Sequence, residues 1–182
     1  MPVWPFPSAR SAAPMPAKSA APVAMWLCLS AALVALDQFT KQLVSGALTF
    51  GEAVTVTPFL KIVLAHNTGA AFSFLAGAGG WQRWLFAAIA VAASVLIVVL
   101  LHRHRDDARF SLALSLILGG AIGNLIDRVR LGHVIDFIYV HVAEYYWPAF
   151  NVADSAISVG AALLVWESFR RKPGEAAARG QD

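Results

Sequence analysis

The chain has 182 residues, of which 58% are hydrophobic and 14% are charged. Charged residues make up about 25% of an average soluble domain, and a soluble fold of this size could not bury so much apolar side chain, so the composition excludes an ordinary soluble protein and indicates a membrane protein. The net charge of +3 is too small and too scattered to indicate a nucleic-acid partner. Cys28 is the single cysteine, which excludes an intrachain disulfide and a cysteine cluster for zinc.

The chain divides into a membrane core and two tails. Residues 1–21 are rich in Pro, Ala and Ser and lack the large apolar side chains that a packed fold needs, so we predict a disordered tail there. The core, residues 22–171, contains four apolar segments close to the roughly 20 residues that a helix needs to cross a bilayer. These segments lack the strict alternation of barrel strands, and a second tail follows at residues 172–182. The predicted transmembrane helices are residues 22–44, 84–101, 110–129 and 150–169.

The distribution of Lys and Arg predicts the orientation, because basic residues concentrate in cytoplasmic loops. Basic residues precede the first predicted helix, separate the second from the third and follow the fourth, so we expect both termini in the cytoplasm. The other two connections then face outward. The basic residues concerned are Arg10, Lys18, Arg103, Arg105, Arg109, Arg170, Arg171 and Lys172.

The two outward connections carry structural signals of their own. In the long one, about residues 45–83, the segment Ala53–Leu64 is β-branched and partly alternating, which predicts two short strands with Pro58 at the bend. In the short one, the segment Ile138–Tyr146 mixes apolar, aromatic and histidine residues, which favours a strip lying in the membrane interface. The expected fold is an α-helical integral membrane protein with four transmembrane helices, a small outward β-rich part and an interfacial segment.

Polar and small residues inside the apolar segments carry the next signals. Asp37 and Lys41 lie four residues apart, so they share a helix face and are expected to form a structural ion pair. Gly119 and Gly123 have the small-xxx-small spacing that lets two membrane helices approach closely. Gly132 is expected to end the third helix in a left-handed conformation. All five residues have a structural explanation.

Three aspartates gather on the outward side. Asp127 shares a helix face with Asn124, and Asp136 follows in a segment that we expect to be extended chain. Asp154 would be the third residue of the fourth helix, with Asn151 as its N-cap, so capping alone is one explanation for both residues. Acidic residues at membrane depth are costly, however, and three on one side favour a functional role.

Paired carboxylates are the chemistry that fits these acids. Arg128 and Arg130 are the only residues expected nearby to neutralise them, and no zinc-binding spacing such as HExxH is present. Two acids in one low-dielectric site cannot both ionise easily, so one keeps a proton while the other activates water, without metal or cofactor. We predict Asp154, near a helix N-terminus, as the base and Asp136 as the acid. Asp127 is the alternative to Asp136.

Other interpretations predict different patterns. His66, His133 and His141 are scattered along the sequence and are interpreted as interfacial or satisfied histidines. A transporter would have polar residues strung across the bilayer, whereas the second apolar segment carries no charge and the acids gather on one side. A scaffold held together by glycine contacts would need neither Asp136 nor Asp154.

Five blocks of residues, in order along the chain, resemble the bacterial lipoprotein signal peptidases (signal peptidase II), a family of aspartic intramembrane peptidases. The resemblance runs from about Asp37 to Gly160, and both tails lie outside it. The blocks are Asp37-Gln38-x-Thr40-Lys41, Asn67-Thr68-Gly69-Ala70-Ala71-Phe72-Ser73, Gly119-Gly120-x-x-Gly123-Asn124-x-x-Asp127-Arg128, Val134-Ile135-Asp136-Phe137 and Phe150-Asn151-x-Ala153-Asp154.

The resemblance implies an endopeptidase that removes the signal peptide from a prolipoprotein, cutting just before a cysteine that carries diacylglycerol. It implies Asp136 and Asp154 as the catalytic pair, no cofactor, and inhibition by the cyclic peptide globomycin. It also implies a monomer in the lipid of the bacterial inner membrane, with the active site near the outer leaflet, a β-cradle over the site and a lid around Tyr145. The residues expected to bind substrate or orient the acids are Asn67, Gly120, Asn124, Arg128 and Asn151, with Asp37, Lys41 and Asp127 as structural support.

Overall fold

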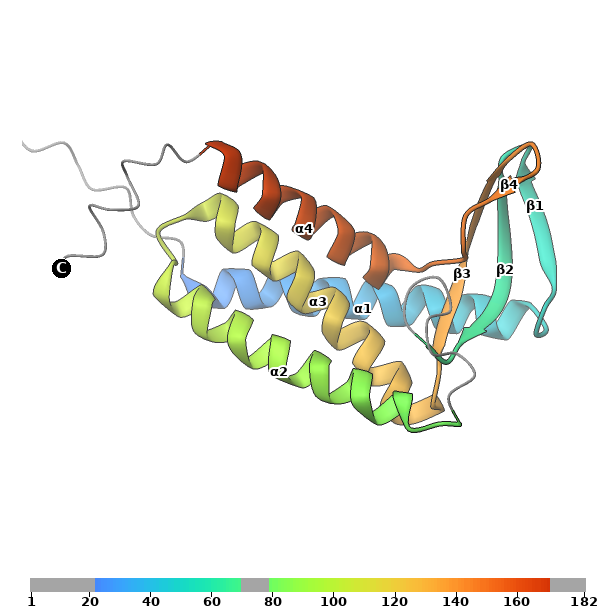
Figure 1. Cartoon of the computed structure of the whole chain (residues 1–182), viewed down its shortest axis with the longest axis horizontal. Coiled ribbons are helices and arrows are strands. Elements are labelled where there is room, and N and C mark those ends of the chain that lie inside the picture. Colours follow the sequence, from blue (N-terminus) through green and yellow to red (C-terminus); the bar gives the residue numbers. More distant parts are fainter. Residues whose placement is uncertain (1–21, 70–78, 171–182) are drawn as a thin grey trace, which may run out of the picture.

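The computed structural model describes residues 22–69 and 79–170, so the predicted tails lie outside the described residues. Within this part of the chain, four long helices form a bundle, and a four-stranded antiparallel sheet stands at one end of it (Figure 1). Each helix is long and apolar enough to cross a membrane. The elements are α1 Val23–Ala47, β1 Ala53–Thr57, β2 Leu60–Asn67, α2 Gln82–Arg103, α3 Ala108–Leu131, β3 Val134–Val142, β4 Tyr145–Tyr146 and α4 Val152–Arg170.

The helix ends differ by one to three residues from the limits of the predicted apolar segments. α2 and α3 extend two residues past the predicted spans at both ends. α4 begins two residues later than predicted, at Val152, because Asn151 is its N-cap: the side-chain oxygen of Asn151 accepts a hydrogen bond from the backbone N–H of Asp154 at 2.9 Å. α3 ends as predicted at Gly132, whose φ of 84° is left-handed.

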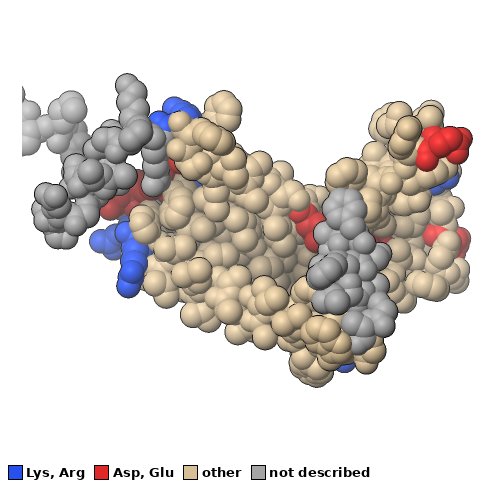
Figure 2. All heavy atoms as spheres, viewed as in Figure 1, with Lys and Arg blue, Asp and Glu red and all other residues tan. Residues whose placement is uncertain are grey.

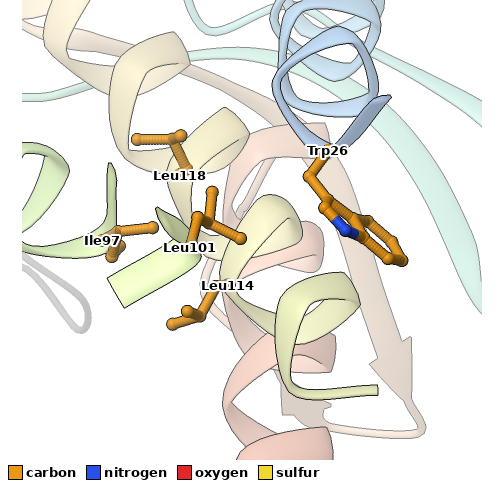
Figure 3. Packing of buried hydrophobic residues seen from close by; sticks show 5 residues of the cluster. All are labelled: Trp26, Ile97, Leu101, Leu114 and Leu118. Carbon is orange, nitrogen blue, oxygen red and sulfur yellow. The ribbon is translucent and has the colours of Figure 1, made fainter. Parts of the chain in front are cut away.

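α3 is the central helix of the bundle. It packs against the other three helices, and 56% of its most apolar stretch is buried, compared with 17% in each of the others. Figure 3 shows the apolar core at the end of the bundle away from the sheet, where Trp26 of α1, Ile97 and Leu101 of α2, and Leu114 and Leu118 of α3 meet. Large apolar side chains on the outer faces of α1, α2 and α4 are exposed, which suits contact with lipid.

The predicted small-xxx-small contact is confirmed, and it joins α3 to α1. A Cβ atom on Gly119 would lie 3.0 Å from the carbonyl oxygen of Ser30, and a Cβ atom on Gly123 would lie 2.7 Å from a carboxylate oxygen of Asp37. The hydroxyl of Ser30 also donates a hydrogen bond to the carbonyl oxygen of Ser115 at 2.9 Å. Glycine therefore lets the two backbones approach closely enough for polar side chains of α1 to reach α3.

The sheet contains strands from both of the connections that were predicted to face outward. β1 and β2 form the predicted hairpin around Pro58. β3, which comes from the short connection, pairs with β2 and then with β4, so the residues predicted as extended chain and as an interfacial strip belong to the same sheet. In this register Ala65 lies opposite Asp136 and Asn67 lies opposite Val134. The sheet thus joins the long connection to the segment that follows α3.

Charged side chains lie mainly at the two ends of the molecule. In Figure 2, basic side chains (blue) gather at the end of the bundle away from the sheet, where α2, α3 and α4 carry Arg103, Arg109 and Arg170. Acidic atoms (red) are visible in the hollow between the helices and the sheet. The long apolar surface between these ends carries almost no charge in this view, as expected for a bundle in a bilayer.

Candidate active site

A cavity of about 720 Å³ lies between α3, α4, the loop that precedes α4, and the strands β2 and β3. Figure 2 shows acidic atoms in this region of the molecule, where the helices meet the sheet. Five of the predicted site residues line the cavity and come from four different elements: Asn67, Asn124, Arg128, Asp136 and Asp154. The fold therefore collects residues that are up to 87 positions apart in the sequence (67 to 154).

Asp136 projects from β3 and is 2% exposed. Its two carboxylate oxygens accept separate hydrogen bonds, one from the amide of Asn67 at 3.1 Å and one from the amide of Asn151 at 2.7 Å. Burial and then the negative charge of Asp154 raise the pKa of Asp136 from 3.8 to about 7, against the opposing effect of the two amides and of Lys41. Asp136 can therefore hold or release a proton close to neutral pH.

Asp154 lies in the first turn of α4, at the predicted third position after the N-cap. One of its carboxylate oxygens accepts a hydrogen bond from the amide of Asn124 at 2.8 Å. The N-terminal end of α4 adds favourable backbone dipoles for a negative charge. The capping explanation and the functional one are thus compatible, because Asn151 caps the helix with its oxygen while its amide nitrogen holds Asp136.

A buried cation lies beside these acids, which corrects the expectation that only arginines would neutralise them. The ammonium nitrogen of Lys41 is 2.8 Å from a carboxylate oxygen of Asp37, the predicted ion pair, and also 2.8 Å from a carboxylate oxygen of Asp127. Lys41 is 1% exposed and Asp37 is fully buried. The sequence did not reveal that the lysine of α1 would reach an acid of α3.

Asp127 has a different environment from Asp136 and Asp154. Besides its ion pair with Lys41, it accepts hydrogen bonds from the side chain of Gln38 at 2.8 Å and from the backbone N–H of Ile135 at 3.2 Å. It is absent from the described residues that line the cavity. Its carboxylate is engaged in holding α1, α3 and the start of β3 together.

Gln38 is a site residue that sequence reasoning missed. Its amide donates to Asp127 and, at 3.2 Å, to the carbonyl oxygen of Gly123. The available signal was its position, since an amide next to Asp37 in an apolar helix must find a partner inside the bundle. Gln38 therefore belongs with the residues that tie α1 to α3.

Gly120 and Arg128, two predicted site residues of α3, make different kinds of contact. A Cβ atom on Gly120 would collide with the carbonyl oxygen of Ala153 and with Ile157, so this glycine lets α3 and α4 come together. Arg128 lines the cavity, and its guanidinium donates to the carbonyl oxygens of Gly69 and Asn124 at 3.1 and 3.4 Å. The part of the second sequence block that runs from residue 70 to 73 lies outside the described residues.

Two of the histidines that look scattered in the sequence are stacked in the structure. The rings of His66 and His133 have centroids 3.9 Å apart, and His66 lines the cavity. Burial, and next the proximity of His66, lower the pKa of His133, with Asp127 opposing. The two rings meet because β2 and the segment before β3 lie side by side, and their interpretation as interfacial or satisfied histidines stays a prediction. In the described part of the chain, no group of three or more His, Cys, Asp or Glu could hold a metal ion.

Fold and site together define a class: a helical membrane protein with two carboxylates in a cavity at one end of its bundle. Comparison with known proteins gives the family. The family described as signal peptidase (SPase) II matches residues 29–170, and the chain belongs to that family.

Relatives and solved structures agree with this assignment. The chain is 54% identical over 152 residues to a lipoprotein signal peptidase of Paraburkholderia phymatum, an alignment that covers 84% of this chain and 92% of the relative. It is 54% identical over 147 residues to that of Cupriavidus taiwanensis, covering 81% and 84%. A bacterial membrane enzyme solved at 2.3 Å superposes with a TM-score of 0.74 and 30% identity, over 81% of this chain and 88% of that one.

Proposed function

We propose that the chain is an aspartic endopeptidase that removes signal peptides from prolipoproteins, cutting just before a cysteine that carries diacylglycerol. The observation that supports this most is the pair Asp136 and Asp154 on one cavity, each held by an asparagine amide. An aspartic peptidase needs two carboxylates that share one proton, and the pKa of about 7 for Asp136 suits the acid of such a pair. The family to which the chain belongs supports the same reaction.

The proposed reaction needs only water and the two carboxyl groups. Ionised Asp154 accepts a proton from water, whose oxygen attacks the carbonyl carbon of the scissile peptide, while Asp136 donates its proton to the carbonyl oxygen. The tetrahedral diol then collapses with cleavage of the C–N bond. The leaving nitrogen takes the proton from Asp154, and Asp136 recovers a proton from one hydroxyl group, which restores the starting state.

The remaining polar residues would position the pair and the substrate. Asn67 and Asn151 hold both oxygens of Asp136, and Asn124 holds Asp154. Arg128 lines the cavity and can donate to a carbonyl oxygen of the bound peptide as it does to that of Gly69. We further propose that the protein works as a monomer among the lipids of the inner membrane. Both termini would be cytoplasmic, the site would lie near the outer leaflet, and globomycin would inhibit the enzyme.

The test is cleavage of a purified, diacylglyceryl-modified prolipoprotein in detergent, with a chelator present. Asp136→Asn and Asp154→Asn should each lower kcat by at least about a hundredfold, the usual contribution of general acid–base catalysis. Asp127→Asn should retain measurable activity, and the exposed Asp106→Asn is the matched control.

Three outcomes would overturn the proposal or part of it. An inactive Asp127→Asn beside an active Asp136→Asn would reassign the pair. A folded wild type that does not cleave the substrate would favour a transporter, and unimpaired growth of cells that carry both asparagine substitutions would favour a scaffold.

A further inference from the structure

Lys41 is a buried cation whose hydrogen-bonding capacity is used completely. Its ammonium group has three N–H donors, and three acceptors surround it: Asp37 and Asp127, each at 2.8 Å, and the side-chain oxygen of Asn124 at 2.9 Å. The two carboxylates hold the ammonium group in place. The third contact reaches the asparagine that binds Asp154.

The contact with Lys41 determines which way the carboxamide of Asn124 points. The oxygen of Asn124 accepts from Lys41 and, at 3.3 Å, from the amide of Asn151. Its NH₂ group must therefore point the other way, where it donates to Asp154 at 2.8 Å. Turning the carboxamide by 180° would set its NH₂ group against two donors and its oxygen against a carboxylate, which leaves buried polar groups unpaired.

We propose that Lys41 is a positioning residue of the peptidase reaction, which fixes the carboxamide of Asn124 so that its NH₂ group holds the catalytic carboxylate of Asp154. This inference rests on the proposed roles of Asp136 and Asp154. Lys41 does not line the cavity, so it acts through Asn124 rather than on the substrate. The chain of contacts runs from α1 through α3 to the first turn of α4.

A second contact shows that α1 also supports the first turn of α4 directly. The other carboxylate oxygen of Asp37 accepts the backbone N–H of Ala153 at 2.9 Å. A purely structural role for Lys41, in which it only neutralises Asp37 and Asp127, is therefore the alternative. The two roles differ in what happens when the whole group of charges is removed together.

A double-mutant cycle tests the coupling between Lys41 and Asn124. Lys41→Met should lower kcat by at least about tenfold, the effect of losing one charge-assisted hydrogen bond, and should change KM little. In the Asn124→Ala background, Lys41→Met should lower kcat further by less than about threefold, because the carboxamide through which Lys41 acts is absent. Lys61→Met, on β2 and outside the cavity lining, is the matched control.

A neutral triple variant separates positioning from neutralisation and guards against a misfolded single variant. Lys41→Met combined with Asp37→Asn and Asp127→Asn leaves no unpaired charge. We expect this variant to keep a low kcat with little change in KM, because the carboxamide of Asn124 has lost the group that orients its donor toward Asp154. Recovery of kcat to within about threefold of wild type would overturn the inference.

The failure of this inference is distinguishable from failure of the proposed function. If Asp154→Asn is inactive while the effects of Lys41→Met and Asn124→Ala on kcat simply multiply, only the positioning role of Lys41 is excluded. If Asp154→Asn cleaves like wild type, the catalytic pair and the positioning role fall together.

Discussion

At the scale of single residues, the carboxyl group of Asp136 shows how the site controls a proton. Two amide donors, from Asn67 and Asn151, favour its charged form, yet burial and Asp154 outweigh them and raise its pKa to about 7. The folded protein thus binds a proton at pH values where the unfolded chain has already released it. Ionisation of Asp136 therefore destabilises the fold as the pH rises from about 4 to about 7.

Asp136→Asn should change the pH dependence of stability in a defined direction. Asparagine cannot ionise, so the Tm of the variant relative to wild type should increase between about pH 4 and about pH 7 and then level off. Thermal unfolding in detergent at a series of pH values measures this difference. Asp106→Asn, at an exposed position, should give a Tm difference that does not depend on pH. A pH-independent difference for Asp136→Asn would contradict the raised pKa.

At the scale of elements, the distance between α3 and α4 is set by glycines at both ends of their contact. Gly120, near the site, faces the carbonyl oxygen of Ala153 and the side chain of Ile157. Gly160, farther along α4, faces α3 at Ala113 and Ile117. The contact at Gly120 keeps Asn124 of α3 within hydrogen-bond distance of Asp154 of α4. The contact at Gly160 lies away from the site.

Gly120→Ala should therefore reduce activity by more than its loss of stability explains. The added methyl group forces α3 and α4 apart next to the pair of acids, and kcat should fall at least about tenfold. Gly160→Ala should lower the Tm through a similar clash while affecting kcat less. Gly46→Ala, which meets no atom within 4 Å, should be neutral or slightly stabilising. Equal kcat values for Gly120→Ala and Gly160→Ala would argue against a link between this glycine and the site.

At the scale of the whole molecule, polarity is distributed along the axis of the bundle. The end away from the sheet carries basic residues in the α2–α3 connection and at the end of α4, whereas the buried acids and the sheet occupy the other end (Figures 1 and 2). The positive-inside tendency is the basis of the proposed orientation, in which the sheet and the cavity face the outside of the cell. This orientation suits an enzyme whose proposed substrates are lipoproteins crossing the membrane.

Cysteine labelling tests the orientation. Cys28 is the single cysteine, so a Cys28→Ser background allows one new thiol at a time. With Glu144→Cys, between β3 and β4, a membrane-impermeant maleimide should label spheroplasts directly. With Arg105→Cys, between α2 and α3, labelling should require disruption of the membrane, because both positions are exposed but lie at opposite ends. The reverse pattern would place the cavity in the cytoplasm and contradict the proposed location.

The sequence by itself determined the features that depend on local pattern. Apolar length predicts four membrane helices, and N-cap chemistry predicts the arrangement of Asn151 and Asp154, because both follow from interactions within a few residues. Left-handed geometry at Gly132 and close packing at Gly119 and Gly123 are predictable for the same reason. The preference for Asp136 over Asp127 rested on its place in the extended segment at the membrane surface, and the resemblance to a known family agreed with it.

Only the tertiary structure decided which polar groups meet. Lys41 reaches Asp127 and Asn124 because glycines bring α1 and α3 together, and His66 stacks on His133 because β2 pairs with β3. Such contacts depend on helix rotation and strand register, which the spacing of residues within one segment does not specify. The physical reason is that burial makes each unpaired charge costly, so the partners are fixed by the packing of the whole bundle.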